Sequence, residues 1–189
     1  MDMEKMKKIV REQLSNERYA HTLRVVEVAK ALAERFHVAK EPVVIAALFH
    51  DFQKDIPPER LKQLIKEYEL PPRLLSYHHE LWHGPVAAKK LELEYGIEDL
   101  QVLKAIYYHT TGRACMTEVE LVIFVADYIE PGRSFPGVDR VRRLAEQDLY
   151  LAAYQALKQT ITYLVERENI IHPDTFEAYN DLTKKLGVK

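Results

Sequence analysis

The sequence is poor in cysteine: Cys115 is the only one among 189 residues. A single cysteine excludes an intramolecular disulfide, and a chain without disulfides is typical of the reducing cytosol. Residues 1–8 contain no apolar stretch of the kind found in a secretory signal. No segment approaches the roughly 18 apolar residues that a membrane span needs. We therefore expect a cytoplasmic protein without a membrane partner.

An excess of either charge is also lacking. The chain has 27 Lys and Arg against 29 Asp and Glu, which gives a formal net charge of −2. This balance offers no global surface for a nucleic acid, so any anion binding must come from a local arrangement of side chains. A chain of this length fits one domain with a substantial core.

Strand signals are absent as well: no segment alternates apolar and polar residues, and there is no internal repeat or low-complexity segment. Helical periodicity dominates instead. His21, Val25, Val28 and Leu32 are spaced four, three and four residues apart, which places them on one helix face. The almost wholly apolar segment 42–49 begins with proline and suits a central helix. The sequence predicts an all-α fold, a single helical bundle.

Further helices are expected between the proline and glycine breaks, over residues 59–68, 84–95 and 98–108. Two segments, Thr117–Glu120 and Asp174–Glu177, match the capping-box pattern of a helix start. Residues 138–167 are expected to form one long helix. His37 and His172 are expected on the surface.

An ionisable pair, His50-Asp51, follows the apolar segment 42–49, and Asp127 follows a second apolar run at 121–126. Burying a carboxylate beside an imidazole is costly unless something neutralises them. A metal ion does this, because it pairs with the carboxylate and accepts the imidazole lone pair. Three more histidines complete a candidate ligand set from separate helices: His21, His83 and His109.

The six candidates divide into two groups. One ion suits the mixed nitrogen and oxygen donors of His21, His50, Asp51 and Asp127, a combination that favours iron, manganese, zinc or nickel over calcium. His83 and His109 offer part of the ligand shell of a second ion, and Asp51 is expected to bridge the two ions at the roughly 3.5–4 Å used in phosphoester chemistry. Each residue alone also has a structural explanation, as a core histidine, a buried cap or a favourable helix end. The joint pattern has no common structural explanation.

These residues, in this order, resemble the HD-domain superfamily of metal-dependent phosphohydrolases. The flanking segments are similar to the YqeK family, whose members are bacterial hydrolases that split diadenosine tetraphosphate symmetrically. The segments that carry the resemblance are Arg18-Tyr19-Ala20-His21, His50-Asp51-Phe52-Gln53-Lys54, His83-Gly84, His109-Thr110-Thr111-Gly112 and Ala126-Asp127-Tyr128-Ile129-Glu130-Pro131-Gly132-Arg133. It extends from Arg18 to the terminal helices and implies one HD-type domain over residues 1–189.

The resemblance implies two divalent or mixed-valence transition metal ions, most often iron, at the six candidate ligands; the spacing alone leaves manganese open. Phosphate handling needs nearby cations, for which Arg18, Lys54 and Arg133 are placed next to ligand segments. Thr110 and Thr111 are expected to donate further hydrogen bonds to the substrate. Each basic residue also fits a solvated surface charge.

We therefore expect hydrolysis of diadenosine tetraphosphate to two ADP by a metal-activated hydroxide, with Asp51 and Lys54 as catalytic residues. An HD-type mononucleotide phosphatase or deoxynucleoside triphosphate hydrolase is one alternative. A non-catalytic nucleotide-binding regulatory domain is another, although its ligand set would be expected to have degraded. The apolar helices permit a homodimer.

Overall fold

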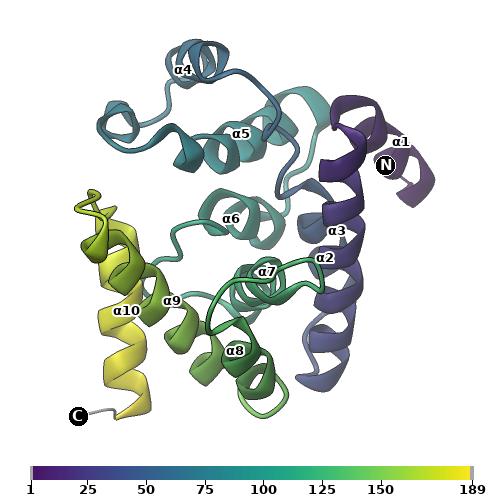
Figure 1. The fold of residues 1–189 in the computed structure, drawn as a ribbon. Helices are drawn as coiled ribbons and strands as arrows, with labels where there is room; N and C mark the ends of the chain where they lie inside the picture. Colours follow the sequence, from purple (N-terminus) through teal and green to yellow (C-terminus); the bar gives the residue numbers. More distant parts are fainter. Residues whose placement is uncertain (1, 188–189) are drawn as a thin grey trace.

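The computed structural model describes residues 2–187, and its regular structure over that range is entirely helical, which confirms the all-α prediction. Two short 3-10 helices, η1 and η2, separate α4 from α5 (Figure 1). The N-terminal helix α1 precedes α2, which contains the candidate ligand His21. The elements are α1 Met3–Gln13, α2 Asn16–Arg35, α3 Lys40–Phe49, α4 Pro58–Glu67, η1 Pro72–Ser76, η2 His79–Leu81, α5 His83–Tyr95, α6 Leu100–Tyr108, α7 Glu118–Ile129, α8 Val138–Ala145, α9 Leu149–Glu166 and α10 Pro173–Leu186.

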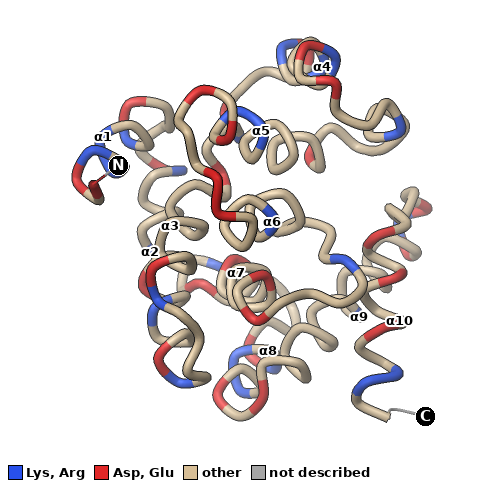
Figure 2. Tube along the Cα trace, turned by 180° about the vertical axis from the view of Figure 1, so that it is seen from behind, with Lys and Arg blue, Asp and Glu red and all other residues tan. Residues whose placement is uncertain are grey.

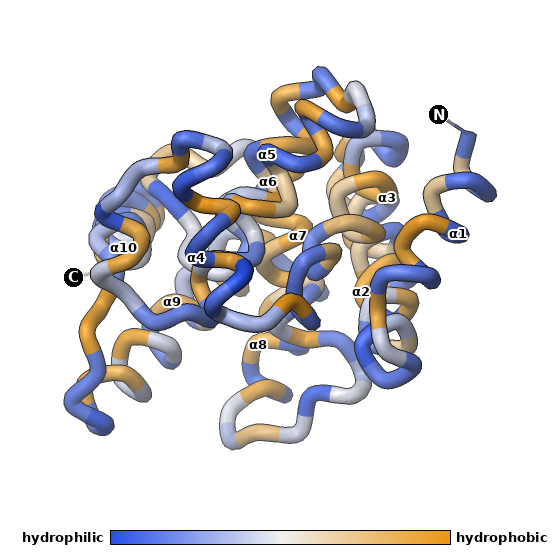
Figure 3. The backbone as a smooth tube through the Cα atoms, turned by 90° about the horizontal axis from the view of Figure 1, so that it is seen from above, coloured by the Kyte–Doolittle hydropathy of each residue, from blue (hydrophilic) through white to orange (hydrophobic). Residues whose placement is uncertain are grey.

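Helix α7 forms the centre of the bundle. Every residue from Val119 to Ala126 is buried, and the helix contacts α2, α3, α6, α8 and α9. Figure 3 shows the apolar positions of α6 and α7 in the middle of the molecule. The helix begins as predicted with a capping box, in which Thr117 Oγ1 accepts from the Glu120 N–H at 3.3 Å and the Glu120 carboxylate accepts from the Thr117 N–H at 2.8 Å.

Helices α2 and α3 pack closely against each other and against α7. Ser15 caps α2 by accepting from the Arg18 N–H, which fixes the helix phase that buries His21 on the same face as Val25 and Leu32. Helix α3 buries its last four residues, so the chain that leaves it, beginning at His50, starts inside the protein. The apolar sequence of α3 therefore delivers polar residues to a buried position.

The predicted long helix over residues 138–167 is wrong, because the chain forms α8 and α9 with a break at residues 146–148. Asp148 Oδ1 accepts hydrogen bonds from the Tyr150 and Leu151 N–H groups, so this carboxylate caps a new helix. An aspartate that bonds to nearby backbone favours a cap over a helix interior. No proline or glycine marks the break, which is why periodicity alone continued through it.

The predicted capping box at Asp174 is also wrong, since α10 begins at Pro173 and its N-cap is His172. The His172 Nδ1 accepts from the Asp174 N–H at 3.2 Å. The same ring lies against Tyr77, with centroids 4.4 Å apart, and is 4% exposed. Histidine 172 is therefore a buried residue, contrary to the surface position expected for it, whereas His37 is exposed.

Charged residues of both signs are interspersed on the outer helices, as Figure 2 shows for α4. None of the helices within residues 2–187 combines the length and the apolar character that a membrane crossing requires.

Candidate metal centre

The six candidate ligands come from five helices that meet at one point. Three of these helices, α3, α6 and α7, approach it with their C-terminal ends, where His50, His109 and Asp127 lie. The C-terminus of a helix carries the negative end of its dipole. The remaining residues lie early in α2 (His21), just after α3 (Asp51) and at the first position of α5 (His83). The three helix C-termini therefore favour a cation at this point.

Asp51 lies between two pairs of histidines. Its Oδ2 is 3.6 Å from the Nε2 atoms of both His21 and His50. Its Oδ1 is 3.0 Å from His83 Nε2 and 3.6 Å from His109 Nε2. The residues thus form two buried clusters, each suited to one ion, that share this carboxylate. We call them the His21 cluster (His21, His50, Asp51) and the His83 cluster (Asp51, His83, His109).

Asp127 borders the His21 cluster. Its Oδ1 lies 3.1 Å from His21 Nε2 and 3.9 Å from His50 Nε2. Two ligand atoms that are each about 2.1 Å from one ion, at angles of about 90–110°, lie about 3.0–3.4 Å apart. The separations in both clusters are therefore close to those of atoms that share a divalent transition metal ion.

The imidazole rings are turned so that Nε2 faces the centre. His50, His83 and His109 each direct Nδ1 at the carbonyl oxygen three residues earlier in the chain, at 2.7, 2.8 and 2.8 Å. A carbonyl can only accept a hydrogen bond, so Nδ1 carries the proton and Nε2 of the neutral ring presents a lone pair. A lone pair directed inward is what a metal ligand requires.

The inward-facing Nε2 atoms converge on one another and on carboxylate oxygens, and all of these atoms are hydrogen-bond acceptors. The Nε2 atoms of His83 and His109 face each other at 3.0 Å, with Asp51 Oδ1 beside both. Within residues 2–187, the Nε2 atoms of His21 and His50 are buried without a hydrogen-bond partner, although carboxylate oxygens are near. Converging acceptors repel one another unless a cation lies among them. The residues present therefore fit divalent metal ions.

The electrostatics of the most deeply buried ligands also suit a metal. Burial lowers the pKa of His83 to about 4, and burial likewise lowers the pKa of His50. Burial opposes a charge on Asp51, but the neighbouring rings of His50, His109 and His83 outweigh it and hold the pKa of this carboxyl well below its usual value. Neutral imidazole beside ionised carboxylate is the protonation state in which both groups bind metal.

Histidine 21 differs from the other three. Burial lowers its pKa, but contact with Asp127 and with the further carboxylates Asp51 and Glu130 outweighs burial, so the pKa is raised overall. Its Nδ1 lies 3.1 Å from Glu130 Oε1 rather than from a carbonyl. This ring is therefore the one most closely surrounded by negative charge.

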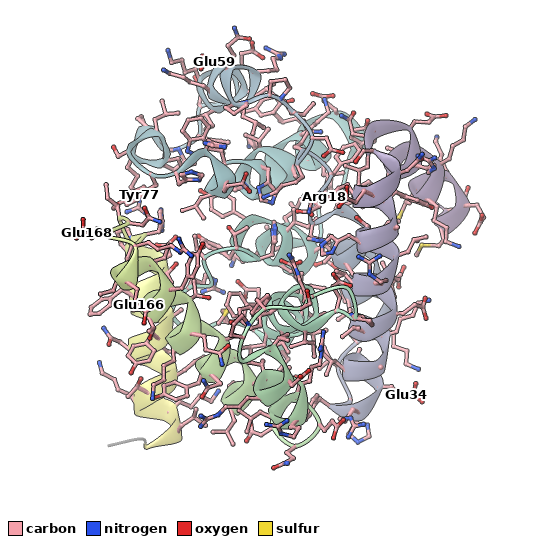
Figure 4. All side chains as sticks on the ribbon, viewed as in Figure 1. Arg18, Glu34, Glu59, Tyr77, Glu166 and Glu168 are labelled. Atoms are coloured by element: carbon pink, nitrogen blue, oxygen red, sulfur yellow. The ribbon has the colours of Figure 1, made fainter. Side chains whose placement is uncertain are left out.

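The three cations predicted for phosphate binding each contact the centre or its neighbours. Arg18 Nη1 donates to Asp51 Oδ2 at 3.0 Å, and Figure 4 shows this residue on the side of α2 that faces α5 and α6. Arg133 donates to the carbonyl and to Oδ1 of Asp127, at 3.0 and 2.6 Å. Lys54 pairs with the carboxylate of Glu80, whose carbonyl holds His83.

The two predicted threonines follow His109 directly. The buried Thr110 Oγ1 has no hydrogen-bond partner among the residues that the structure describes, whereas Thr111 Oγ1 donates to the Gly112 carbonyl at 2.9 Å. Gly84 lies close to α6. A Cβ at this position would lie 2.9 Å from the Ile106 carbonyl oxygen and 3.2 Å from His109 Cε1. Glycine at this position therefore lets α5 approach α6 closely enough for their two histidines to meet.

A polar cavity of about 320 Å³ adjoins the His21 cluster, and charged residues line most of it. Three of them are arginines: Arg18, Arg24 and Arg133. Guanidinium groups are well suited to phosphate oxygens, which they contact through paired donors. The lining also includes three carboxylates, Glu17, Asp55 and Glu130, so the arginines are the groups through which this cavity would contact an anion.

Sequence reasoning missed Arg24 and left Glu130 open between a role in the site and a role in packing or capping. Arg24 lies three residues after His21 on α2 and so shares a helix face with that candidate ligand. That spacing was the signal that could have identified Arg24. Two further histidines that lie near His83 in sequence, His78 and His79, belong to neither cluster.

Comparison with known proteins gives a consistent result. A family model described as "HD domain" matches residues 18–132, a range that contains all six candidate ligands. The chain is 47% identical over 180 residues to a protein of Bacillus subtilis named "Bis(5'-nucleosyl)-tetraphosphatase, symmetrical", covering 95% of this chain and 97% of that one. A protein of the same name from Staphylococcus aureus is 43% identical over 182 residues, covering 95% and 94%.

A solved structure has the same fold over nearly its whole length. It is the crystal structure of a protein from Clostridium acetobutylicum described as a predicted HD superfamily hydrolase involved in NAD metabolism. The TM-score is 0.92 and the identity 35%, and the match covers 98% of both chains.

Proposed function

Because this chain belongs to the HD-domain family and, within it, to the symmetrical bis(5'-nucleosyl)-tetraphosphatases, we propose that it hydrolyses dinucleoside polyphosphates. Diadenosine tetraphosphate is the proposed substrate and two ADP are the products. The observation that carries the proposal is the Asp51 carboxylate, which presents one oxygen to each of two histidine pairs in a buried centre. Such a centre suits hydrolysis of a phosphoric anhydride.

The ligands of the proposed ions are His21, His50, Asp51 and Asp127 for one, and Asp51, His83 and His109 for the other. We propose two divalent or mixed-valence transition metal ions, with iron as the native metal and manganese as the alternative. Bound ions would supply positive charge against the phosphoryl oxygens and would lower the pKa of water toward about 7. Asp51 would contribute a ligand atom to each of the two ions, because it belongs to both clusters.

The chain's own cations are proposed to bind and orient the tetraphosphate. Arg18 and Arg133 lie on either side of the His21 cluster and line the polar cavity beside it. Several charge-assisted contacts at once favour a long polyphosphate over a single phosphate group. The Thr110 hydroxyl and the Thr111 backbone, which follow His109, are proposed as further donors to the substrate.

The first prediction concerns the products. Protein purified without oxygen and analysed for metal should convert diadenosine tetraphosphate into ADP alone, as chromatography of the reaction mixture will measure. Equal amounts of ATP and AMP would instead indicate asymmetric cleavage. Rapid hydrolysis of AMP or dATP without action on the dinucleotide would support the mononucleotide alternative. Saturable nucleotide binding by metal-loaded protein without turnover would support a regulatory domain.

The second prediction concerns Lys54, proposed as a phosphate-binding catalytic residue. Its charge lies near enough to His83 to lower the pKa of that ring, after the larger contributions of burial and His109. A charge-assisted hydrogen bond is worth about 1.5–3 kcal/mol, so Lys54→Ala should lower kcat/KM about 10–100-fold. Metal content should stay unchanged, because lysine contacts the phosphates and not the ions.

Lys89→Ala is the matched control, because Lys89 also forms an ion pair with a glutamate, Glu92, but on the outer face of α5. It should retain wild-type turnover. Equal kinetics in the two variants would remove Lys54 from the site, and loss of metal in the Lys54 variant would assign it a different role.

Three coarser features complete the proposal. Residues 1–189 are proposed to act as one domain, which is supported by the larger of the two clusters of buried apolar side chains within residues 2–187, because its members run from Met6 to Leu182. A homodimer and a cytoplasmic location stay predictions. Sedimentation of the purified protein tests the first, and fractionation of the source cells tests the second.

A further inference from the structure

The four histidines of the centre are oriented in two different ways. In His50, His83 and His109 the Nδ1 proton is held by a main-chain carbonyl of the same local segment. In His21 the partner is the side chain of Glu130, which lies 109 residues away in sequence. A carboxylate raises the basicity of the imidazole it holds and fixes the ring's tautomer and orientation. His21 alone therefore depends on a distant side chain for its orientation.

Glu130 is itself firmly held. It is 2% exposed, and its Oε2 accepts from Arg24 Nε at 2.5 Å and from the Gly132 N–H at 2.6 Å. Its Oε1 faces His21 Nδ1 and, at 3.4 Å, Arg24 Nη2. Contacts at both carboxylate oxygens therefore hold this side chain in one orientation.

The turn after Glu130 has little freedom to move. At Gly132 a Cβ would lie 2.5 Å from Arg24 Nη2 and 2.9 Å from Glu130 Oε1, so a larger residue would displace the contacts that hold the glutamate. The next residue, Arg133, donates to both the carbonyl and the carboxylate of Asp127. One short turn therefore reaches two of the candidate ligands, His21 on α2 and Asp127 on α7.

We propose that Glu130 is a positioning residue that holds His21 in the tautomer and orientation needed for metal binding and so sets the affinity of the ion at the His21 cluster. The inference rests on the proposed metal-dependent function. It extends that function because the two ion sites differ in the groups that orient their histidines. The His83 cluster, whose imidazoles are held by the main chain alone, does not depend on Glu130.

The test is a titration of the metal-free protein with Co²⁺ alone, in competition with a colorimetric chelator. Glu130→Gln is introduced into two backgrounds, which isolate the two ion positions. In a His83→Ala background the remaining ion at the His21 cluster should bind about 10–100-fold more weakly than without the Glu130 change. In a His21→Ala background the same change should alter affinity by less than about twofold, because the ring through which it acts is gone.

A matched control separates positioning from general packing. Glu120 is as buried as Glu130 and is held by Arg113 through two hydrogen bonds of 2.6 and 2.8 Å, but it contacts no candidate ligand. Glu120→Gln should leave Co²⁺ affinity unchanged in both backgrounds. The visible spectrum of bound Co²⁺, which reports its coordination, should change only with the Glu130 variant.

Glu130→Asp provides a second variant, which keeps the charge beside Arg24 but withdraws the carboxylate from His21. It should weaken the same ion in the same background, even where Glu130→Gln fails to fold. Unchanged Co²⁺ affinity in a folded Glu130 variant would overturn the inference, as would equal losses at both clusters or equal losses in the Glu120 control. Absence of Co²⁺ binding by the unmutated protein would instead contradict the proposed function.

Discussion

Asp51→Ala is expected to abolish hydrolysis of diadenosine tetraphosphate, with a fall in kcat/KM of about 10³-fold or more. The substitution removes the one carboxylate that faces all four histidines. If the loss of bound ions removes even about 4 kcal/mol of transition-state stabilisation, the rate falls about 10³-fold. The measurement is steady-state turnover together with the metal content of the purified variant, which should fall for both ions.

His79→Ala is the control for this prediction. The ring of His79 is 43% exposed and lies outside both clusters, so turnover and metal content should be those of the unmutated protein. Circular dichroism should show that the Asp51 variant keeps its helices, since the buried charge and its partner ions leave together. An Asp51 variant with wild-type turnover would show that the assignment of the centre is wrong.

Phe49→Ala is expected to have the largest effect on stability. The side chain is fully buried and packs edge-on against Phe52, with ring centroids 5.3 Å apart. Truncating a buried phenylalanine typically costs about 3–5 kcal/mol, because it removes apolar contacts and leaves a cavity. That is a large part of the roughly 5–15 kcal/mol that holds most domains folded. Urea unfolding will measure the loss as a lower midpoint with an unchanged slope.

The matched control is Phe176→Ala, in which the same side chain is lost from a position that is 53% exposed. Its effect should lie within about 0.5 kcal/mol. Because Phe49 immediately precedes His50 and Asp51, metal affinity should also fall in the Phe49 variant but not in the Phe176 variant. Similar unfolding midpoints for the two variants would show that the end of α3 is not anchored as described.

The sequence allowed the fold class to be predicted because helix periodicity and capping are local signals. The phase of His21 with Val25 and Leu32, and the capping box at Thr117, depend on neighbours within one or two turns. The break before Asp148 was not predictable in this way, since an aspartate in a periodic segment fits both a helix interior and a cap. The burial of His172 depends on Tyr77, a contact that is distant in sequence.

For the centre, the sequence identified the six candidate ligands but not their geometry. The segments around His50 and Asp127 indicated ligands, because each places an ionisable residue at the end of an apolar helix. Which oxygen of Asp51 faces which histidine depends on how the helices pack, and no local pattern contains that information. The salt bridge from Lys54 to Glu80 was invisible for the same reason.

The main-chain contacts of three of the imidazoles also bear on how this centre tolerates mutation over generations. Their acceptors are the carbonyl oxygens of Ala47, Glu80 and Ile106, and every amino acid has such an oxygen. Codons at those three positions can therefore change without removing the acceptor, provided that the helix or turn survives. His21 has no such protection, because a single nucleotide change at codon 130 can remove its partner. In a lineage that drifts without selection for activity, orientation of His21 should be the first of the four to fail.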